Sequence, residues 1–367
     1  MNRKRRAARL GSAVAIGLGV ILAGTGPASA GGSHAPKVSA PLAAGLAGPL
    51  QIDVGRDGKV LVGQAFSGTV STVDRKGRQS DIFNEPGAEG VEYGREWGSV
   101  VYTFTSSPPP GEAPPPGFVP QAELRIRNAK GTTRTIADLL AYETANNPDG
   151  GNEYGIFGLS DDCAAQLPPD VGLLPYPGIV ESHPYAVTDV NGGWVVADAA
   201  ANAILFVSTK GHVKTVAVLP PQAPVTITAE AAAANELPEC TVGAEYVAEP
   251  VPTDVEVGPG GLYVSTLPGG PEDPSLGARG GVYKVNPWNG KVKMIAGGFA
   301  GATNLAVTPW GAISVSELFG GQISKVVGDH GVPVVQVPEP AALEWAHGKL
   351  YAGIGAFSNG QIVTVKL

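Results

Sequence analysis

The chain has 367 residues, of which 52 are glycine and 33 are proline, while only 16% are charged. This composition excludes a coiled coil or a helical bundle. Hydrophobic residues make up 43% of the chain and recur in short Val, Ile and Leu clusters, which excludes a wholly disordered polymer. The composition predicts a turn-rich, all-β globular protein.

Residues 1–30 have the three-part plan of a secretory signal peptide. Five basic residues within the first nine positions precede an apolar run at 10–24, and Ala28-Ser29-Ala30 follows. An uncleaved anchor is the alternative, although the run is shorter than the about 20 residues that cross a bilayer. Cleavage near Ala30 leaves 20 basic and 33 acidic residues, a net charge of −13, which disfavours a nucleic-acid partner. We therefore expect a secreted, extracellular chain with no membrane span.

Six segments of the chain follow one template of an apolar strand, a glycine-containing turn and a second apolar strand. They begin at Pro49, Gly90, Pro184, Pro252, Ala302 and Pro340, so successive starts lie 41, 94, 68, 50 and 38 residues apart. The shortest spacings match the about 40 residues of a four-stranded propeller blade, and the longer ones contain insertions. Asp57-Gly58 and Asn191-Gly192 supply the positive φ that tight hairpins need. The sequence predicts a single six-bladed β-propeller over residues 31–367.

The sixth repeat is too short for four strands, because only 28 residues remain from Pro340 to Leu367. The segment from Lys37 to Leu46 resembles the last strand of the fourth repeat and directly precedes the first inner strand. Pairing of this N-terminal strand with the last blade would close the ring and remove its open edges.

Four insertions, at 106–120, 141–183, 221–251 and 268–280, fall on connections that emerge on one face of an antiparallel blade. We expect them to cap one mouth of the central channel, with short helices at 136–146 and 228–237. Surface decoration without a role is the alternative.

The only two cysteines, Cys163 and Cys240, lie in two of these insertions, on either side of the third repeat. An even count in an exported chain predicts a disulfide, here spanning 77 positions. Two isolated buried thiols are the alternative.

Long motifs along nearly the whole mature chain carry a resemblance to a known family. They include Asn147-Pro-Asp-Gly-Gly, Ser182-His-Pro-Tyr-Ala-Val, Pro252-Thr-Asp-Val-Glu-Val and Ser316-Glu-Leu-Phe-Gly-Gly. In these motifs the chain is similar to the exported ScyD/ScyE family of actinobacteria and cyanobacteria. The resemblance implies an NHL-like, gluconolactonase-like six-bladed propeller, and cyanobacterial members are associated with the pathway of the pigment scytonemin. It implies no catalytic residue.

Polar residues recur two positions after the repeat starts. Glu92, Asp254 and Asn304 share this register with Gln51. Such oxygens, pointed at one end of the channel, could hold Ca²⁺, and the three residues resemble the Glu/Asp/Asn set of gluconolactonase-type propellers. A metal there could polarise a lactone carbonyl or a water molecule. Bonding to inner-strand backbone and channel water is the alternative.

Gln64, Asp198 and Glu317 end the second strands of three repeats and are each followed four residues later by Gly or Asn. A carboxylate there can accept turn N–H groups, so these side chains are expected to cap their own hairpins, with ligand binding as the alternative. His183, at the start of the third repeat, is the histidine placed as a general base would be, yet no nucleophile has a defined relation to it.

The sequence therefore favours a monomeric, secreted propeller that binds a small molecule or an extracellular protein or polymer at its capped mouth. A metal-dependent lactonase or related hydrolase, using Glu92, Asp254 and Asn304, is the second hypothesis. A structural protein of the cell envelope is the third. The motifs of nucleotide hydrolysis, zinc proteolysis and nucleophile-elbow hydrolysis do not occur in the chain.

Overall fold

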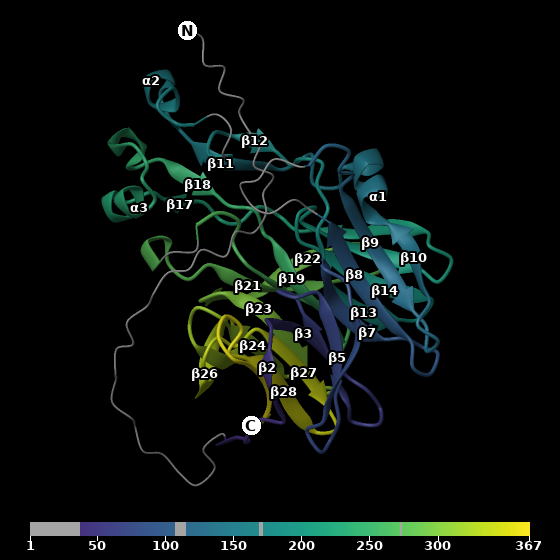
Figure 1. Cartoon of the computed structure of the whole chain (residues 1–367). Helices are drawn as coiled ribbons and strands as arrows, with labels where there is room; N and C mark the ends of the chain where they lie inside the picture. The colour runs from purple at the N-terminus through teal and green to yellow at the C-terminus, as the bar shows by residue number, and fades with distance from the viewer. Residues whose placement is uncertain (1–36, 107–114, 169–171, 272–273) are drawn as a thin grey trace.

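The computed structural model describes residues 37–106, 115–168, 172–271 and 274–367. The predicted signal peptide and most of the insertion at 106–120 lie outside these residues. The described chain is built mainly of antiparallel strands arranged in several small sheets, in the manner of a propeller (Figure 1). None of the helices in this part of the chain has the length and hydropathy to cross a bilayer.

Five sets of four strands make most of the body of the molecule, each wound outward from one inner strand. The first two sheets are β3 (Pro49–Val54), β4 (Val60–Gln64), β5 (Thr69–Val73), β6 (Gln79–Asn84), and β7 (Ala88–Tyr93), β8 (Val100–Ser106), β9 (Gln121–Arg127), β10 (Thr133–Asp138). The third is β13 (Pro184–Val190), β14 (Gly193–Asp198), β15 (Ala203–Ser208), β16 (Val213–Val218). The next two are β19 (Pro252–Gly258), β20 (Gly261–Thr266), β21 (Gly280–Val285), β22 (Val292–Phe299), and β23 (Ala302–Val307), β24 (Ile313–Glu317), β25 (Gln322–Val327), β26 (His330–Gln336). One parallel bridge, Gly297 to His330, joins β22 to β26 and merges these last two sets into one sheet.

The last sheet of the body combines both ends of the described chain. It contains β27 (Ala342–Ala346), β28 (Lys349–Ile354) and β29 (Gly360–Lys366), with β1 (Lys37–Val38) and β2 (Ala43–Leu46) paired antiparallel to β29. The expected pairing of the N-terminal segment with the last strand is therefore present.

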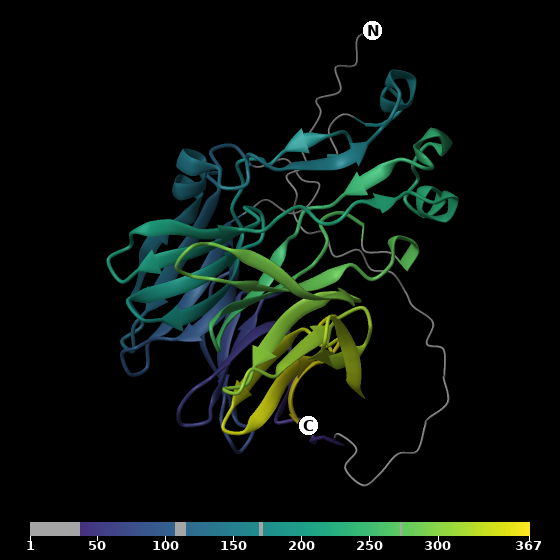
Figure 2. The same cartoon turned by 180° about the vertical axis from the view of Figure 1, so that it is seen from behind.

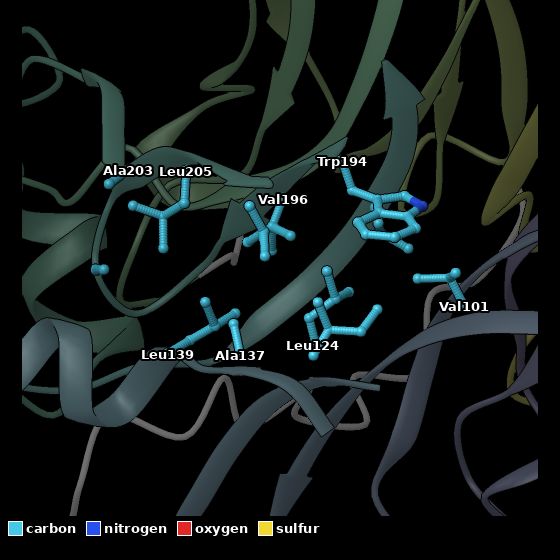
Figure 3. Packing of buried hydrophobic residues seen from close by; sticks show 12 residues of the cluster. Val101, Leu124, Ala137, Leu139, Trp194, Val196, Ala203 and Leu205 are labelled. Carbon is cyan, nitrogen blue, oxygen red and sulfur yellow. The ribbon is translucent and has the colours of Figure 1, made fainter. Parts of the chain in front are cut away.

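Inner strands of consecutive sheets lie against one another. The contacts run in the order β3, β7, β13, β19, β23 and β27, and β27 also contacts β3. Apolar side chains fill the space between neighbouring sheets, because residues on both faces of each sheet are buried. Figure 3 shows one such layer, in which Val101 and Leu124 pack against Trp194, Val196 and Leu205 of the next sheet.

Two predicted turns have the backbone that their glycines allow. Gly58 and Gly192 have φ of 75° and 90°, in the left-handed region that favours glycine, and each lies between an inner strand and its partner. This geometry sets the alignment of both hairpins.

Two long insertions meet in a separate lobe beside the body (Figures 1 and 2). Its sheet has the order β12 (Tyr176–Pro177), β11 (Glu153–Phe157), β18 (Glu245–Val247), β17 (Val225–Thr226). The helices of the lobe are α2 (Asp161–Ala164), α3 (Ala229–Ala234) and the 3₁₀ turn η1 (Glu239–Thr241). A second 3₁₀ turn, η2 (Pro274–Leu276), contacts α3. We call this unit the insertion lobe.

Cys163 of α2 and Cys240 of η1 form a disulfide, as predicted. The bond joins the two insertions, and α2 lies at the end of the lobe farthest from the body (Figure 1). The helix expected at 228–237 is α3, which begins after Thr228 because the Thr228 hydroxyl accepts the Ala231 N–H. The helix expected at 136–146 is shorter: α1 (Leu139–Asn146) begins after Asp138, and residues 136–138 belong to β10.

Candidate functional site

His183 forms the polar centre of a site at the N-terminal ends of the inner strands. Its Nε2 lies 2.7 Å from Glu89 Oε2, which comes from β7 of the neighbouring sheet. The His183 and Glu89 side chains are 25% and 18% exposed, so solvent reaches both. Sequence reasoning missed Glu89, although it occupies the same inner-strand register as Tyr185, two residues after His183.

Asp198, at the end of β14, fixes the backbone of His183. One carboxylate oxygen accepts the N–H groups of His183 and Ala201, at 2.7 and 3.2 Å, and the other accepts the Ser182 hydroxyl at 2.5 Å. Asp198 is fully buried, so its carboxylate is shielded from water. The carboxylate both caps its own turn, as predicted, and ties that turn to the segment that carries His183.

The charge state of His183 depends on these acidic neighbours. Burial disfavours the imidazolium, but Glu89, helped by Asp198 and Glu181, favours it more strongly, and the pKa of His183 is raised above its ordinary value. The raised pKa favours the imidazolium form of His183 beside Glu89.

An apolar surface adjoins the His183–Glu89 pair. The Tyr185 ring lies 6.0 Å from the His183 ring and packs against the cluster that contains Leu50 of β3 and Ala341, the residue before β27. Leu318 and Phe357 belong to the same cluster, and Phe357 stacks on the half-exposed Phe66 at 5.8 Å. The site thus combines one donor–acceptor pair with aromatic and aliphatic walls.

Three predicted polar residues of the inner strands are bonded to one another and to backbone. Asp254 Oδ2 accepts the Leu305 N–H at 3.0 Å, and Asn304 Oδ1 accepts the Leu343 N–H at 2.8 Å. Gln51 accepts from Asn304 Nδ2 and donates to the Thr253 carbonyl, both at 3.1 Å. These bonds link inner strands of different sheets, which was the alternative to metal ligation.

The register assigned to Glu92 is wrong. Strand pairing aligns Val91 opposite Tyr102 as it aligns Ile52 opposite Val62, so the second repeat starts at Ala88 and not at Gly90. Gly90 therefore occupies the strand position equivalent to Gln51. Glu92 lies two residues further along its strand, at the position equivalent to Asp53. The assignment was two residues off because Ala88 and Gly90 are both small and both resemble the first residue of a repeat.

Glu92 instead belongs to a group of inner-strand carboxylates that the sequence did not predict, with Asp53, Glu256 and Glu344. Burial raises the pKa of each, and neighbouring carboxylates raise it further; for Asp53 this neighbour is Asp189, and for the other three the neighbours include members of the group. The Asp53 carboxylate accepts the Tyr93 N–H at 2.7 Å. Near the C-terminal ends of the same strands a hollow of about 470 Å³ is lined by Val257, Val307 and Trp345. The signal for these carboxylates in the sequence was an acidic residue two positions after the polar register, in four of the six repeats.

Within the described residues, no three His, Cys, Asp or Glu side chains are grouped as metal ligands. The Ca²⁺ site predicted at Glu92, Asp254 and Asn304 contains only two residues of these types, because Asn304 is an amide. It therefore stays a prediction.

Gln64 and Glu317 occupy the same position in their sheets as Asp198. Gln64 Oε1 accepts the Ala47 N–H and Glu317 Oε2 accepts the Ala300 N–H, at 2.9 and 2.8 Å. Ala47 and Ala300 each lie two residues before an inner strand. These side chains thus hold the entry segments of the inner strands; a role in ligand binding stays a prediction.

No protein-family model and no curated protein matches the sequence. Solved structures do match over most of the chain. A candidate glucose dehydrogenase of Thermus thermophilus aligns at 14% identity and a TM-score of 0.52, over 90% of this chain and 100% of that one. A luciferin-regenerating enzyme aligns at 8% identity and a TM-score of 0.51, over 88% of this chain and 92% of that one. A protein of unknown function from Bacteroides thetaiotaomicron aligns at 11% identity and a TM-score of 0.51, over 90% of this chain and 76% of that one. What they share with this chain is the fold. At these identities the likeness carries nothing about activity.

Proposed function

We propose that this protein is an exported six-bladed β-propeller of the ScyD/ScyE type that binds a small apolar molecule with a hydroxyl group beside His183. The cyclic order of inner-strand contacts and the pairing of β1 and β2 with β29 support the six blades and the closure. The disulfide supports an oxidising, extracellular location. The insertion lobe enters the body directly before β13 and β19, which supports its role as a cap over this mouth.

The observation that carries the ligand class is the partly exposed His183–Glu89 pair beside apolar side chains. A hydroxyl both donates and accepts, so it can bond to the Glu89 carboxylate and to the imidazole together. The pair has little net charge when His183 is protonated, so it gives no preference for a charged ligand. The partly exposed rings of Tyr185, Phe357 and Phe66 offer the apolar contact that an aromatic body requires.

The test uses 2-naphthol as the probe, with naphthalene as its counterpart that lacks the hydroxyl. We expect wild-type protein to bind 2-naphthol about tenfold more tightly than naphthalene, since a hydrogen bond to a charged group contributes about 1.5 kcal/mol. Glu89→Gln and His183→Gln should remove that preference. Fluorescence titration at pH 6 measures the Kd values.

His330→Gln is the matched control, because His330 pairs with Asp329 on the exposed surface. It should leave the preference unchanged. Equal affinity for both probes in the wild type, or an unchanged preference in Glu89→Gln, would refute the proposed site.

The lactonase hypothesis keeps Glu92, Asp254 and Asn304 as its metal ligands. It requires Asp254 to release the Leu305 N–H, or to use its second oxygen for the metal. Lactone hydrolysis that depends on added Ca²⁺ and is lost in Asp254→Asn would favour it over simple binding.

A further inference from the structure

A compact group of buried oxygen atoms lies where α1 ends and the insertion lobe begins. Both carboxylate oxygens of Glu143, and one side-chain oxygen each of Asn147, Asp149 and Asn202, have no hydrogen-bond partner among the described residues. Glu143 and Asp149 are 1% exposed and Asn202 is 0% exposed. Leaving five buried acceptors without a donor is costly, since each unsatisfied group costs about 1–3 kcal/mol.

Local geometry brings the four side chains together. Asn147 follows α1 one turn after Glu143, and its N–H bonds to the Glu143 carbonyl at 2.7 Å. Asn202 Nδ2 donates to Asp149 Oδ2 at 2.8 Å, which leaves the other oxygen of each side chain unpartnered. Burial, and after it the charges of Asp198 and Asp149, raise the pKa of Glu143 to about 8.

The segment that supplies these oxygens is held in a fixed shape. Asn147 is in the left-handed conformation, with φ 37°, and its Nδ2 donates to the Gly178 carbonyl at 3.0 Å. Gly178 lies so close to Asp149 that an added Cβ would stand 2.2 Å from Asp149 Oδ1. The Asp149 carboxylate also accepts the Tyr154 hydroxyl at 3.0 Å, which ties it to β11 of the insertion lobe.

We propose that Glu143, Asn147, Asp149 and Asn202 bind one Ca²⁺ ion that fastens the insertion lobe to the body. All five free atoms are oxygens, which suits a hard cation, and a Glu with two free oxygens can bind it in bidentate fashion. Ca²⁺ accepts six to eight oxygens at variable angles, so backbone carbonyls or water complete the shell. A bound cation would also stabilise the ionised forms of Glu143 and Asp149, which burial disfavours. The set has two carboxylates and two amides, and it is separate from Glu92, Asp254 and Asn304.

The experiment measures bound metal and thermal stability on the full mature chain. After dialysis against Ca²⁺-free buffer, elemental analysis should find about one Ca²⁺ per chain. Stripping with a chelator should lower the Tm, and Ca²⁺ at about 100-fold above its Kd should raise it again by about 5 °C. Mg²⁺ at the same concentration should restore less than half of the shift, because it demands near-octahedral geometry.

Variants assign the site. Glu143→Gln should abolish both the bound Ca²⁺ and the Tm shift; it should still fold, because the Glu143 side chain has no hydrogen bond to lose among the described residues. Glu153→Gln, an exposed carboxylate of the same lobe, is the matched control and should behave as wild type. Absence of both Ca²⁺ and a chelator effect, or retention of both in Glu143→Gln with loss in Asp254→Asn, would overturn the proposal.

Discussion

His183 is the residue whose protonation we expect to affect stability most directly. Its pKa is raised because Glu89, Asp198 and Glu181 outweigh the effect of burial. Its folded pKa thus exceeds the unfolded value of about 6.5, so the protonated pair stabilises fully below that pH and loses its contribution as pH rises through the folded pKa. We expect His183→Gln to lower the free energy of unfolding by about 1–2 kcal/mol at pH 6, and by less at pH 9. Urea denaturation at both pH values measures the difference.

The control for this prediction is His330→Gln. The exposed His330–Asp329 pair should contribute less than about 0.5 kcal/mol at either pH. A cost of His183→Gln that is the same at pH 6 and pH 9 would show that the imidazole acts only by packing.

Single residues were predicted well where the backbone determines their role. Asp198 was recognised as a cap because a carboxylate at a strand end has turn N–H groups within reach. Glu89 was missed because its partner comes from a repeat 94 residues later, and spacing along one chain does not reveal such a contact. Glu92 was misplaced because small residues at 88–90 allow two alignments, and only strand pairing decides between them.

At the scale of elements, the insertion lobe depends on the Cys163–Cys240 disulfide. Its strands are two to five residues long, so its small sheet has little pairing energy of its own. A link across 77 positions stabilises by at most roughly 4 kcal/mol through the entropy of the unfolded chain. In a Cys163→Ser/Cys240→Ser variant we expect amides of β11 and β18 to exchange at least tenfold faster, while those of β14 stay protected. Hydrogen–deuterium exchange measures both sets in one experiment.

The corresponding Cys163→Ala/Cys240→Ala variant separates the covalent link from the effect of a buried hydroxyl, because Cys163 is 2% exposed. Both variants should show the same exchange pattern. Faster exchange spread evenly over the body would mean that the lobe and body unfold as one unit, contrary to this prediction.

Local signals located the elements more reliably than their pairing. The alanine run at 231–234 identified α3, and Thr228 marked its start. Nothing within either insertion indicated that β11 of one would pair with β18 of the other, since both strands are short and their partners are distant in sequence. The start of α1 was placed too early because residues 136–138 extend β10, where pairing with β9 outweighs helical preference.

At the scale of the whole molecule, the repeat predicted the order of the inner strands, because each repeat produced one strand pair at the same place in its sheet. The pairing of the N-terminal segment with the last strand was predicted because the sixth repeat is too short to contain four strands. The parallel bridge between β22 and β26 was not predictable, since a single residue pair, Gly297 with His330, makes it.

The pairing of the N-terminal segment can be tested by weakening β2. Leu46 is 2% exposed and packs with Ile52, Val62 and Ile362, so Leu46→Ala should lower the free energy of unfolding by about 2–5 kcal/mol. Removing residues 37–46 should do more, because it leaves one edge of β29 without a partner, and such an edge pairs with other chains. We expect the truncated protein to form dimers or larger species in size-exclusion chromatography, whereas Leu46→Ala stays monomeric. Leu367→Ala, at an exposed position beyond β29, is the control and should change neither property. A truncated chain that elutes as the wild type does and is equally stable would show that β29 does not need its N-terminal partner strands.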